Sequence, residues 1–464
     1  MKKTRRAALE KRAVARNLIL LYAAAVVIRF LIALTQSTGP SIIPDEALYS
    51  NIARSILTQG RVLMHGQPVI YDSLLYPLLL IPLYILPKGI DMFRTIQLYN
   101  ILLMTSCIFP GFLLARRFLG KDRPAWIVTL FLLILPDMAL GQLLISECIC
   151  YPLLFWMMYM AMRAFDGSFN LKDAFVVALL SALLYFTKPG LVAIGPVFCI
   201  LYILYAIKEH SGNWKNALAS LAMLAVLFGL IQVMPRFVFQ IDYTKESIYG
   251  SQAMELTATN LFVVFQGFIL LLYFFPISSG ILPVVLPAAG TARVDKRRKY
   301  FIIMLFAALL VTMVGVAYII FLYEWRGQAF FGRVHIRYLA AFIPVLIMFA
   351  MSDDLEGMKL NWTSLVLFVL LFAGTLLLTP GARKSTGTET IDALTLSAFS
   401  MDWLGIPTKT VVLILLLLAI PLIVWVLWRK GYTRRFRVVM LSFLAGLMLL
   451  NNVTGYALLY AGKD

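Results

Sequence analysis

Apolar runs of about 17 to 25 residues recur along the whole chain and alternate with short polar stretches. An α-helix needs about 20 apolar residues to cross the hydrocarbon core of a bilayer. The first run extends from about Leu18 to Leu34 behind a basic leader, and its length favours an uncleaved first span over a removable signal sequence. The pattern predicts an all-α polytopic membrane protein, with about 13 transmembrane helices in a single membrane domain over residues 1–464.

The expected spans after the first lie near residues 95–115, 125–142, 151–165, 174–187, 190–207, 217–235, 260–290, 301–323, 338–350, 361–379, 409–428 and 438–458. The run at 260–290 is long for one helix and contains Pro276, Pro283 and Pro287, so it could be broken. The run at 338–350 is short for a span unless it extends into its flanks.

Residues 36–94 form an unusually long external segment between the first two spans. Within it, Leu74 to Leu86 is apolar but contains two prolines and is too short for a comfortable crossing. This favours an interfacial helix. Counting it as interfacial places every strongly basic block on the inside, whereas counting it as a span would move the Arg116 block outside.

The composition is that of a protein whose solvent is lipid: 61% of residues are hydrophobic, 14% are charged and the mean hydropathy is +0.86. The formal net charge of +18 gathers in short blocks between apolar runs, which is typical of cytoplasmic loops and argues against nucleic-acid binding. The blocks are Lys2 to Arg16, Arg116 to Arg123, Arg293 to Lys299 and Arg429 to Arg437.

The four cysteines, Cys107, Cys148, Cys150 and Cys199, lie in or beside apolar runs and lack the partners of a zinc site. They are expected to be small buried side chains.

Two adjacent carboxylates, Asp45 and Glu46, follow the first span and are expected at the outer face of the membrane. A carboxylate there can accept a proton from a hydroxyl or amine nucleophile. Adjacent helical side chains diverge by about 100°, so usually only one of the two faces a given site. We expect Asp45 to be the base and Glu46 a helper. The alternative is an acidic helix start, in which Asp45 follows Pro44 and interacts favourably with the helix dipole.

Three further ionisable residues lie near the same boundary. Glu147 is embedded in an apolar stretch, where a charge is costly and indicates function. For Asp137, exposure to headgroup water is the better interpretation. Lys188 interrupts an apolar hairpin at a Pro-Gly turn, where it could neutralise an anionic leaving group or extend to the lipid headgroups.

Basic residues also collect directly before the expected span at 338–350, in the order Arg326, Arg333, His335 and Arg337, and Tyr338 follows them. The planar donor fork of arginine suits phosphate oxygens, so this segment could clamp a phosphate; contact with anionic membrane lipids is the alternative. No histidine or cysteine spacing typical of a metal site occurs. Asp45, Glu46 and Glu147 could hold a divalent cation with waters, but carboxylates alone identify no ion.

The order of these features resembles the GT-C glycosyltransferases, polytopic enzymes that move a sugar from a polyprenyl-phosphate carrier at the non-cytoplasmic face. The resemblance spans most of the chain and is strongest to the bacterial aminoarabinose transferase and protein O-mannosyltransferase branch. The matching motifs are Asp45-Glu46 with Tyr49, Tyr76-Pro77-Leu78, Ala115-Arg116-Arg117-Phe118-Leu119-Gly120, Ser146-Glu147 with Pro152, Thr187-Lys188-Pro189-Gly190, and Arg337-Tyr338-Leu339 with Pro344.

This chain departs from the family pattern in two ways. Tyr71-Asp72-Ser73 stands before Leu74 where related sequences often carry a lysine, and only Pro77 remains of a usual proline pair. No large soluble C-terminal domain is expected after the last span.

The resemblance implies a GT-C-like bundle with interfacial helices in the first external loop, at residues 36–94. By position, Asp45 would be the base, Glu147 a second acid, and Lys188 and Arg337 the phosphate ligands. Glu46 completes the expected catalytic set, and Tyr49, Arg333, His335 and Tyr338 complete the expected substrate-binding and phosphate-binding set. The partners would be a polyprenyl-phosphate-linked sugar donor and a lipid, glycan or protein acceptor. Transfer would invert the anomeric carbon, at the outer face of a bacterial inner membrane.

The main alternative is a lipid-linked oligosaccharide flippase or transporter, which predicts charged residues near mid-span. Arg29 is the main such residue within a predicted span. An O-antigen-type polymerase or ligase is a further alternative, but paired acids after the first span are not its usual mark.

Overall fold

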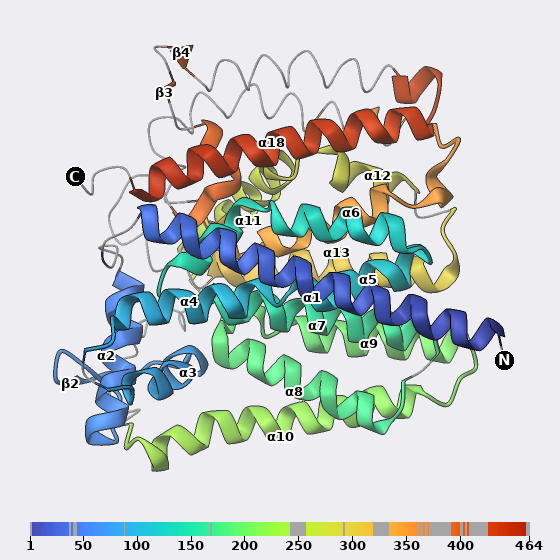
Figure 1. Cartoon of the computed structure of the whole chain (residues 1–464). Helices are drawn as coiled ribbons and strands as arrows, with labels where there is room; N and C mark the ends of the chain where they lie inside the picture. Colours follow the sequence, from blue (N-terminus) through green and yellow to red (C-terminus); the bar gives the residue numbers. More distant parts are fainter. Residues whose placement is uncertain are drawn as a thin grey trace.

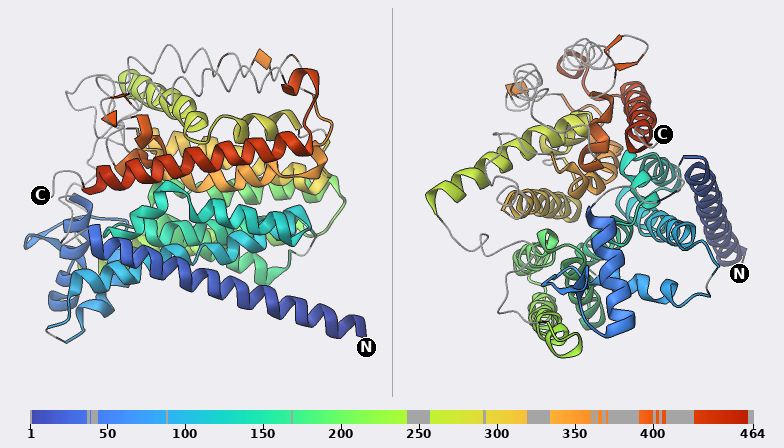
Figure 2. Two further views of the ribbon diagram at one scale, coloured as in Figure 1. Left: turned by 45° about the horizontal axis from the view of Figure 1, so that its top comes forward. Right: turned by 90° about the vertical axis from the view of Figure 1, so that its left-hand side faces the viewer.

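The computed structural model describes residues 2–36, 39, 44–87, 89–167, 169–241, 257–290, 293–318, 334–359, 391–399 and 426–460, with residues 362, 365–366, 370, 402–403 and 406–407. Its long helices run roughly along one direction as a bundle, and Figure 2 shows several of them end-on (Figures 1 and 2). They are α1 Lys2–Gln36, α4 Met92–Thr105, α5 Ile108–Leu119, α6 Asp122–Leu133, α7 Glu147–Phe165, α8 Leu171–Thr187, α9 Ile194–Lys208, α10 Trp214–Val238, α11 Ala258–Ser278, α12 Leu282–Gly290, α13 Lys296–Val316, α15 Ile343–Ala350 and α18 Arg434–Tyr460.

Shorter elements connect these helices. They are α2 Pro44–Gln59, α3 Leu75–Tyr84, the 3-10 turns η1 Pro136–Gln142, η2 Pro189–Leu191, η5 Ile336–Tyr338, η6 Ala340–Phe342, η7 Asp353–Leu355 and η8 Ile391–Phe399, and the antiparallel strand pairs β1 Leu63–Met64 with β2 Gln67–Pro68 and β3 Asp402–Trp403 with β4 Ile406–Pro407.

Within the described ranges, eight helices are long and apolar enough to cross a membrane, or nine if the bent pair α6–η1 counts as one span. The protein is an all-α polytopic membrane protein. Its centre is apolar and tightly packed, and all eight residues of α15 are buried. In α1 and α10 only 17% and 11% of the apolar span is buried inside the protein, which leaves their outer faces for lipid.

The observed helices match most of the expected spans. The run at 260–290 is broken, as its prolines suggested, into α11 and α12. The run at 338–350 forms η5, η6 and the eight-residue α15, and α8 is one apolar helix of 17 residues. The expected spans near 361–379 and 409–428 lie almost wholly outside the described residues.

The segment between α1 and α4 lies across one end of the bundle. In Figure 1, α2 and α3 lie at the left, where α1 ends and α4 begins. The ten residues of α3 extend about 15 Å, which is half the hydrocarbon thickness of a bilayer. The prediction that this apolar segment is not a full crossing is therefore confirmed.

The helix that should span residues 125–142 breaks in the middle. Pro136 disfavours helical geometry at Leu135, which has φ −61° and ψ 127°. The chain bends by 56° between α6 and η1, and the stretch from there to the start of α7 is buried. This unwound stretch leads directly to Glu147.

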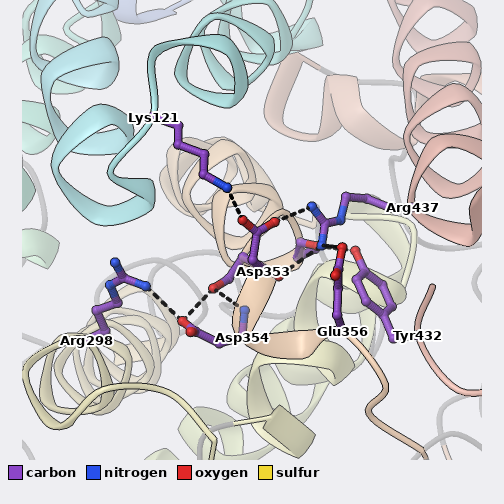
Figure 3. Close-up of polar contacts among 9 residues, drawn as sticks. Lys121, Arg298, Asp353, Asp354, Glu356, Tyr432 and Arg437 are labelled. Atoms are coloured by element: carbon purple, nitrogen blue, oxygen red, sulfur yellow. Dashed lines mark hydrogen bonds and ion pairs between the residues drawn. The ribbon is translucent and has the colours of Figure 1, made fainter. Parts of the chain in front are cut away.

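At the end of the bundle away from α2 and α3, an acidic turn binds basic residues from three parts of the chain (Figures 1 and 3). Asp353 is bound by Lys121 and by Arg437, whose Nη1 lies 2.9 Å from Asp353 Oδ1. Arg298 Nη1 lies 2.8 Å from Asp354 Oδ2. The turn ties the α5–α6 connection to the first turns of α13 and α18. Three of the basic blocks therefore share one end of the bundle, as the predicted topology requires.

The contacts of Asp353 predict a pH-dependent contribution to stability. Hydrogen bonds from Lys121 and Arg437 hold the pKa of Asp353 below its ordinary value. The carboxylate therefore stabilises the fold above that ordinary value, and the contribution is lost as the pH falls through the lowered pKa. We expect Asp353→Asn to destabilise the purified protein at pH 7 by at most about 1 kcal/mol, because the Lys121 pair is half exposed. Thermal unfolding should show no difference below the lowered pKa, and an equal loss at both pH values would contradict the assignment.

Candidate active site

Four charged side chains from four parts of the chain meet beside α2. Arg337 Nη2 lies 3.4 Å from Asp45 Oδ2, and Arg337 Nε lies 3.3 Å from Glu147 Oε1. The same Glu147 oxygen accepts a hydrogen bond of 2.5 Å from Lys188 Nζ. The fold thus joins residues as far apart as 292 positions in one continuous chain of charges.

The local sequence explains where each charge is held. Asp45 lies in the first turn of α2 after Pro44, and Glu147 is the first residue of α7, positions at which a helix dipole favours a carboxylate. Lys188 follows α8 with an extended backbone, φ −149° and ψ 104°, because the next residue is a proline. Arg337 lies in η5, which precedes the buried α15.

Burial distinguishes Asp45 from the other three charges. Glu147 is 1% exposed, Lys188 is 6% exposed and Arg337 is 7% exposed, whereas the side chain of Asp45 is 34% exposed. Removing a charge from water is costly unless an opposite charge replaces the lost hydration. Glu147 supplies that charge for two cations at once, and Asp45 is the acid of the cluster that solvent reaches.

The ring of Tyr338 also holds the two cations together. Its centroid lies 4.0 Å from Lys188 Nζ and 5.5 Å from Arg337 Cζ. The negative face of an aromatic ring attracts cations. Two groups that would repel one another are therefore held side by side by one carboxylate and one ring.

Glu46 and Tyr49 contact the stretch that precedes Glu147. Glu46 is 2% exposed and its Oε1 accepts a hydrogen bond of 3.0 Å from the backbone N–H of Leu144. The Tyr49 hydroxyl lies 3.1 Å from Ser146 Oγ. Adjacent residues on α2 thus diverge as helical geometry requires: Asp45 faces Arg337, while Glu46 fastens α2 to the stretch that precedes Glu147.

The expected exposure of Asp137 to headgroup water is wrong. Asp137 is fully buried, because the bend between α6 and η1 turns it into the protein. Tyr151 Oη lies 3.3 Å from Asp137 Oδ1 and donates a hydrogen bond of 2.9 Å to the Arg337 carbonyl. The sequence analysis did not single out Tyr151, although it lies one helical turn after Glu147 and therefore shares a helix face with it.

The remaining predicted residues are less well defined. His335 is 4% exposed, and its ring lies 6.3 Å from that of Tyr338. Arg333 lies outside the described residues.

In the part of the chain that the structure describes, no group of three or more histidines, cysteines, aspartates or glutamates could hold a metal ion. Glu46 accepts a hydrogen bond from the Leu144 N–H, and Glu147 pairs with Lys188. These different partners do not suit a divalent-cation site shared by Asp45, Glu46 and Glu147. The four cysteines are buried and free, as predicted.

Comparison with solved structures shows what the fold is similar to. No family model and no curated protein matches the sequence. The structure is similar to ArnT from Cupriavidus metallidurans in the apo state, with a TM-score of 0.50 and 16% identity over 96% of this chain and 77% of that chain. The chain has an ArnT-like fold. The ArnT structure bound to undecaprenyl phosphate gives a TM-score of 0.47, with the same identity and coverage.

The double role of Glu147 predicts a large loss of stability when its charge is removed. Glu147→Gln would leave Lys188 and Arg337 buried beside each other without their shared carboxylate. Removing one partner of a buried ion pair typically costs about 3–5 kcal/mol. We expect a correspondingly lower midpoint of thermal unfolding in detergent. Adding Lys188→Met to Glu147→Gln should recover part of the loss, and a double variant no more stable than Glu147→Gln would contradict the coupling.

Proposed function

We propose that this protein is a membrane glycosyltransferase that moves a sugar from a polyprenyl-phosphate donor to an acceptor hydroxyl or amine. The observation that carries the proposal is a solvent-accessible carboxylate, Asp45, in contact with Arg337, which shares the carboxylate of Glu147 with a second buried cation, Lys188. The cations suit a phosphate leaving group, and the carboxylate suits a general base. The ArnT-like fold supports the same class of reaction.

The cation pair would bind the donor phosphate. Lys188 offers an ammonium and Arg337 a planar guanidinium, and both are fixed before substrate arrives because Glu147 and Tyr338 hold them. Positive charge fixed beside the leaving group stabilises the transition state without reorganisation during the reaction. His335 and Tyr338 flank Arg337 in the same segment, and together with Arg333 they remain predicted substrate-binding residues.

Asp45 would act on the acceptor. Its carboxylate takes the proton from the acceptor hydroxyl or amine as that group attacks the anomeric carbon. The bond between the anomeric carbon and the phosphate oxygen breaks, and its electron pair leaves on the phosphate. Attack from the face opposite the phosphate inverts the configuration of the sugar.

The other two acids have structural roles in this proposal. Glu46 is turned to the Leu144 N–H, and Glu147 is occupied by two cations, so neither is placed to take a proton from the acceptor. We assign both as positioning residues, and Tyr49, whose hydroxyl contacts Ser146, as a third.

We propose the membrane orientation from charge. The basic residues at the starts of α6, α13 and α18 lie at the opposite end of the bundle from α2, which carries Asp45, and basic loops favour the cytoplasmic side. This orientation would place Asp45 and the acceptor at the non-cytoplasmic face of the inner membrane of a bacterium.

The first test is the role of Asp45. We expect Asp45→Asn to lower the rate of sugar transfer by about 100-fold to 10,000-fold, because the base is lost while the fold is kept. The measurement is release of radiolabel from a panel of polyprenyl-phosphate sugars incubated with purified protein and envelope extract. Asp91→Asn is the matched control, because asparagine can still cap α4 through the backbone N–H of Arg94. Wild-type activity in Asp45→Asn would remove the proposed base, and no release by wild type would make transport the next function to test.

The second test is the phosphate-binding pair. We expect Arg337→Ala to lower kcat by about 100-fold to 1,000-fold, which is the usual loss for one electrostatic donor at a transition state. Glu147 stays paired with Lys188 in this variant, so the protein should remain folded. Arg54→Gln is the matched control, because Arg54 stacks on Tyr84 away from the cluster. Equal turnover in Arg337→Ala and wild type would exclude Arg337 as a phosphate ligand.

A further inference from the structure

The break between α6 and η1 exposes backbone groups inside a membrane domain. A helix satisfies its own carbonyls, but a break leaves several of them without an N–H partner. In an apolar interior each unpaired group is costly, so irregular backbone at membrane depth requires partners from elsewhere in the protein. The carbonyls of Leu133 and Ile134, at the end of α6, are the groups at issue.

Two side chains from opposite ends of the sequence supply these partners. Arg29 of α1 donates from Nη2 to the Leu133 carbonyl at 2.5 Å and from Nη1 to the Met138 carbonyl at 3.0 Å. Asn452 of α18 donates from Nδ2 to the Ile134 carbonyl at 2.5 Å. One guanidinium therefore bridges the two sides of the bend, and an amide holds the carbonyl between them.

Further side chains continue this support along the unwound stretch. Gln97 and Asn100 of α4 donate to the carbonyls of Gln142 and Leu143, at 3.1 and 2.7 Å. The next residue, Leu144, donates its N–H to Glu46 of α2. The stretch is therefore held from its first residue to a point three residues before Glu147.

The environment of Arg29 argues that capping is its purpose. Arg29 lies six residues before Thr35, where the first span ends, and hence about 9 Å inside the span. Among the described residues no carboxylate pairs with it, and its acceptors are two backbone carbonyls. A charge in a span is expensive, and an apolar residue would suit a helix whose outer face is left for lipid. The carbonyls left without partners at the α6–η1 break explain why a guanidinium is present at this position.

We infer that Arg29 and Asn452 form a clamp on the α6–η1 break and act as positioning residues for Glu147. By fixing the stretch that leads into α7, the clamp sets the place of the carboxylate that holds Lys188 and Arg337. Its effect on catalysis rests on the proposed function, whereas the clamp itself does not. The sequence alone left Arg29 as a residue that a transporter could explain. The clamp gives this charge a structural role that needs no transported substrate.

Cys148 provides a reporter of the clamp that is independent of activity. It is fully buried directly after Glu147, and its Sγ lies 3.9 Å from the Leu140 carbonyl in η1. In a background with alanine at Cys107, Cys150 and Cys199, we expect Cys148 to resist N-ethylmaleimide. Arg29→Met and Asn452→Leu should each speed its alkylation on the order of tenfold, because local opening exposes the thiol.

Two comparison variants make this test specific. Tyr22→Phe removes a hydrogen bond of 3.0 Å from the same helix α1 to the Leu102 carbonyl, outside the unwound stretch, and should leave Cys148 protected. Arg29→Lys keeps the charge but replaces the two guanidinium nitrogens that reach Leu133 and Met138 with a single ammonium nitrogen, so it should lie between wild type and Arg29→Met. Size-exclusion chromatography identifies any variant that fails to fold, in which case Asn452→Leu and Arg29→Lys carry the test. Unchanged alkylation in the folded variants overturns the clamp.

Transfer kinetics then test positioning. We expect Arg29→Met to lower kcat by about tenfold or more with a smaller change in the donor KM, and Arg29→Lys to recover part of kcat, because the cations would no longer be held against the transition state. Faster alkylation with unchanged kcat would overturn the positioning role. If wild type transfers no sugar at all, the proposed function fails, while Cys148 alkylation still decides whether the clamp exists.

Discussion

The 2.5 Å contact between Glu147 and Lys188 forms where both residues are almost completely buried, so each charge depends on the other for its presence there. Arg337 reaches the same carboxylate oxygen and depends on it as well. A site that binds phosphate needs cations that are fixed before the ligand arrives, and two adjacent cations cannot be fixed in an apolar interior without an acid between them. In the proposed function Glu147 meets this requirement, and Asp45 acts on the acceptor.

The hydropathy pattern was informative about the ends of helices, and the site is built from such ends. Asp45, Glu147 and Lys188 each stand where an apolar run begins or stops, so their common depth in the membrane could be predicted from sequence. The fold class and the broken run at 260–290 followed from the same pattern. The sequence could not decide which of the adjacent acids, Asp45 or Glu46, faces the cluster. That choice depends on how α2 is rotated about its axis, which its packing determines.

The wrong prediction for Asp137 has its physical origin in the broken helix. Asp137 was expected near water because its run looked like one straight span, in which it would lie close to the boundary. The bend before η1 instead carries Asp137 into the interior, next to Tyr151. The same bend creates the carbonyls that Arg29 and Asn452 cap. In a linear hydropathy pattern Arg29 looks misplaced, because its acceptors lie about a hundred positions away. These acceptors are main-chain carbonyls, which no residue type marks in the sequence.

The contact between Arg337 and Asp45 would couple donor binding to catalysis in the proposed function. The four charges balance, with Asp45 and Glu147 opposite Lys188 and Arg337. Arg337 holds Asp45 at 3.4 Å, which is long for a charged hydrogen bond, while Glu147 holds Lys188 at 2.5 Å. A donor phosphate bound to Arg337 would add negative charge beside the carboxylate of Asp45, which is the acid of the cluster that solvent reaches. The proposed donor would therefore separate Asp45 from Arg337, and its arrival would itself free the group that activates the acceptor.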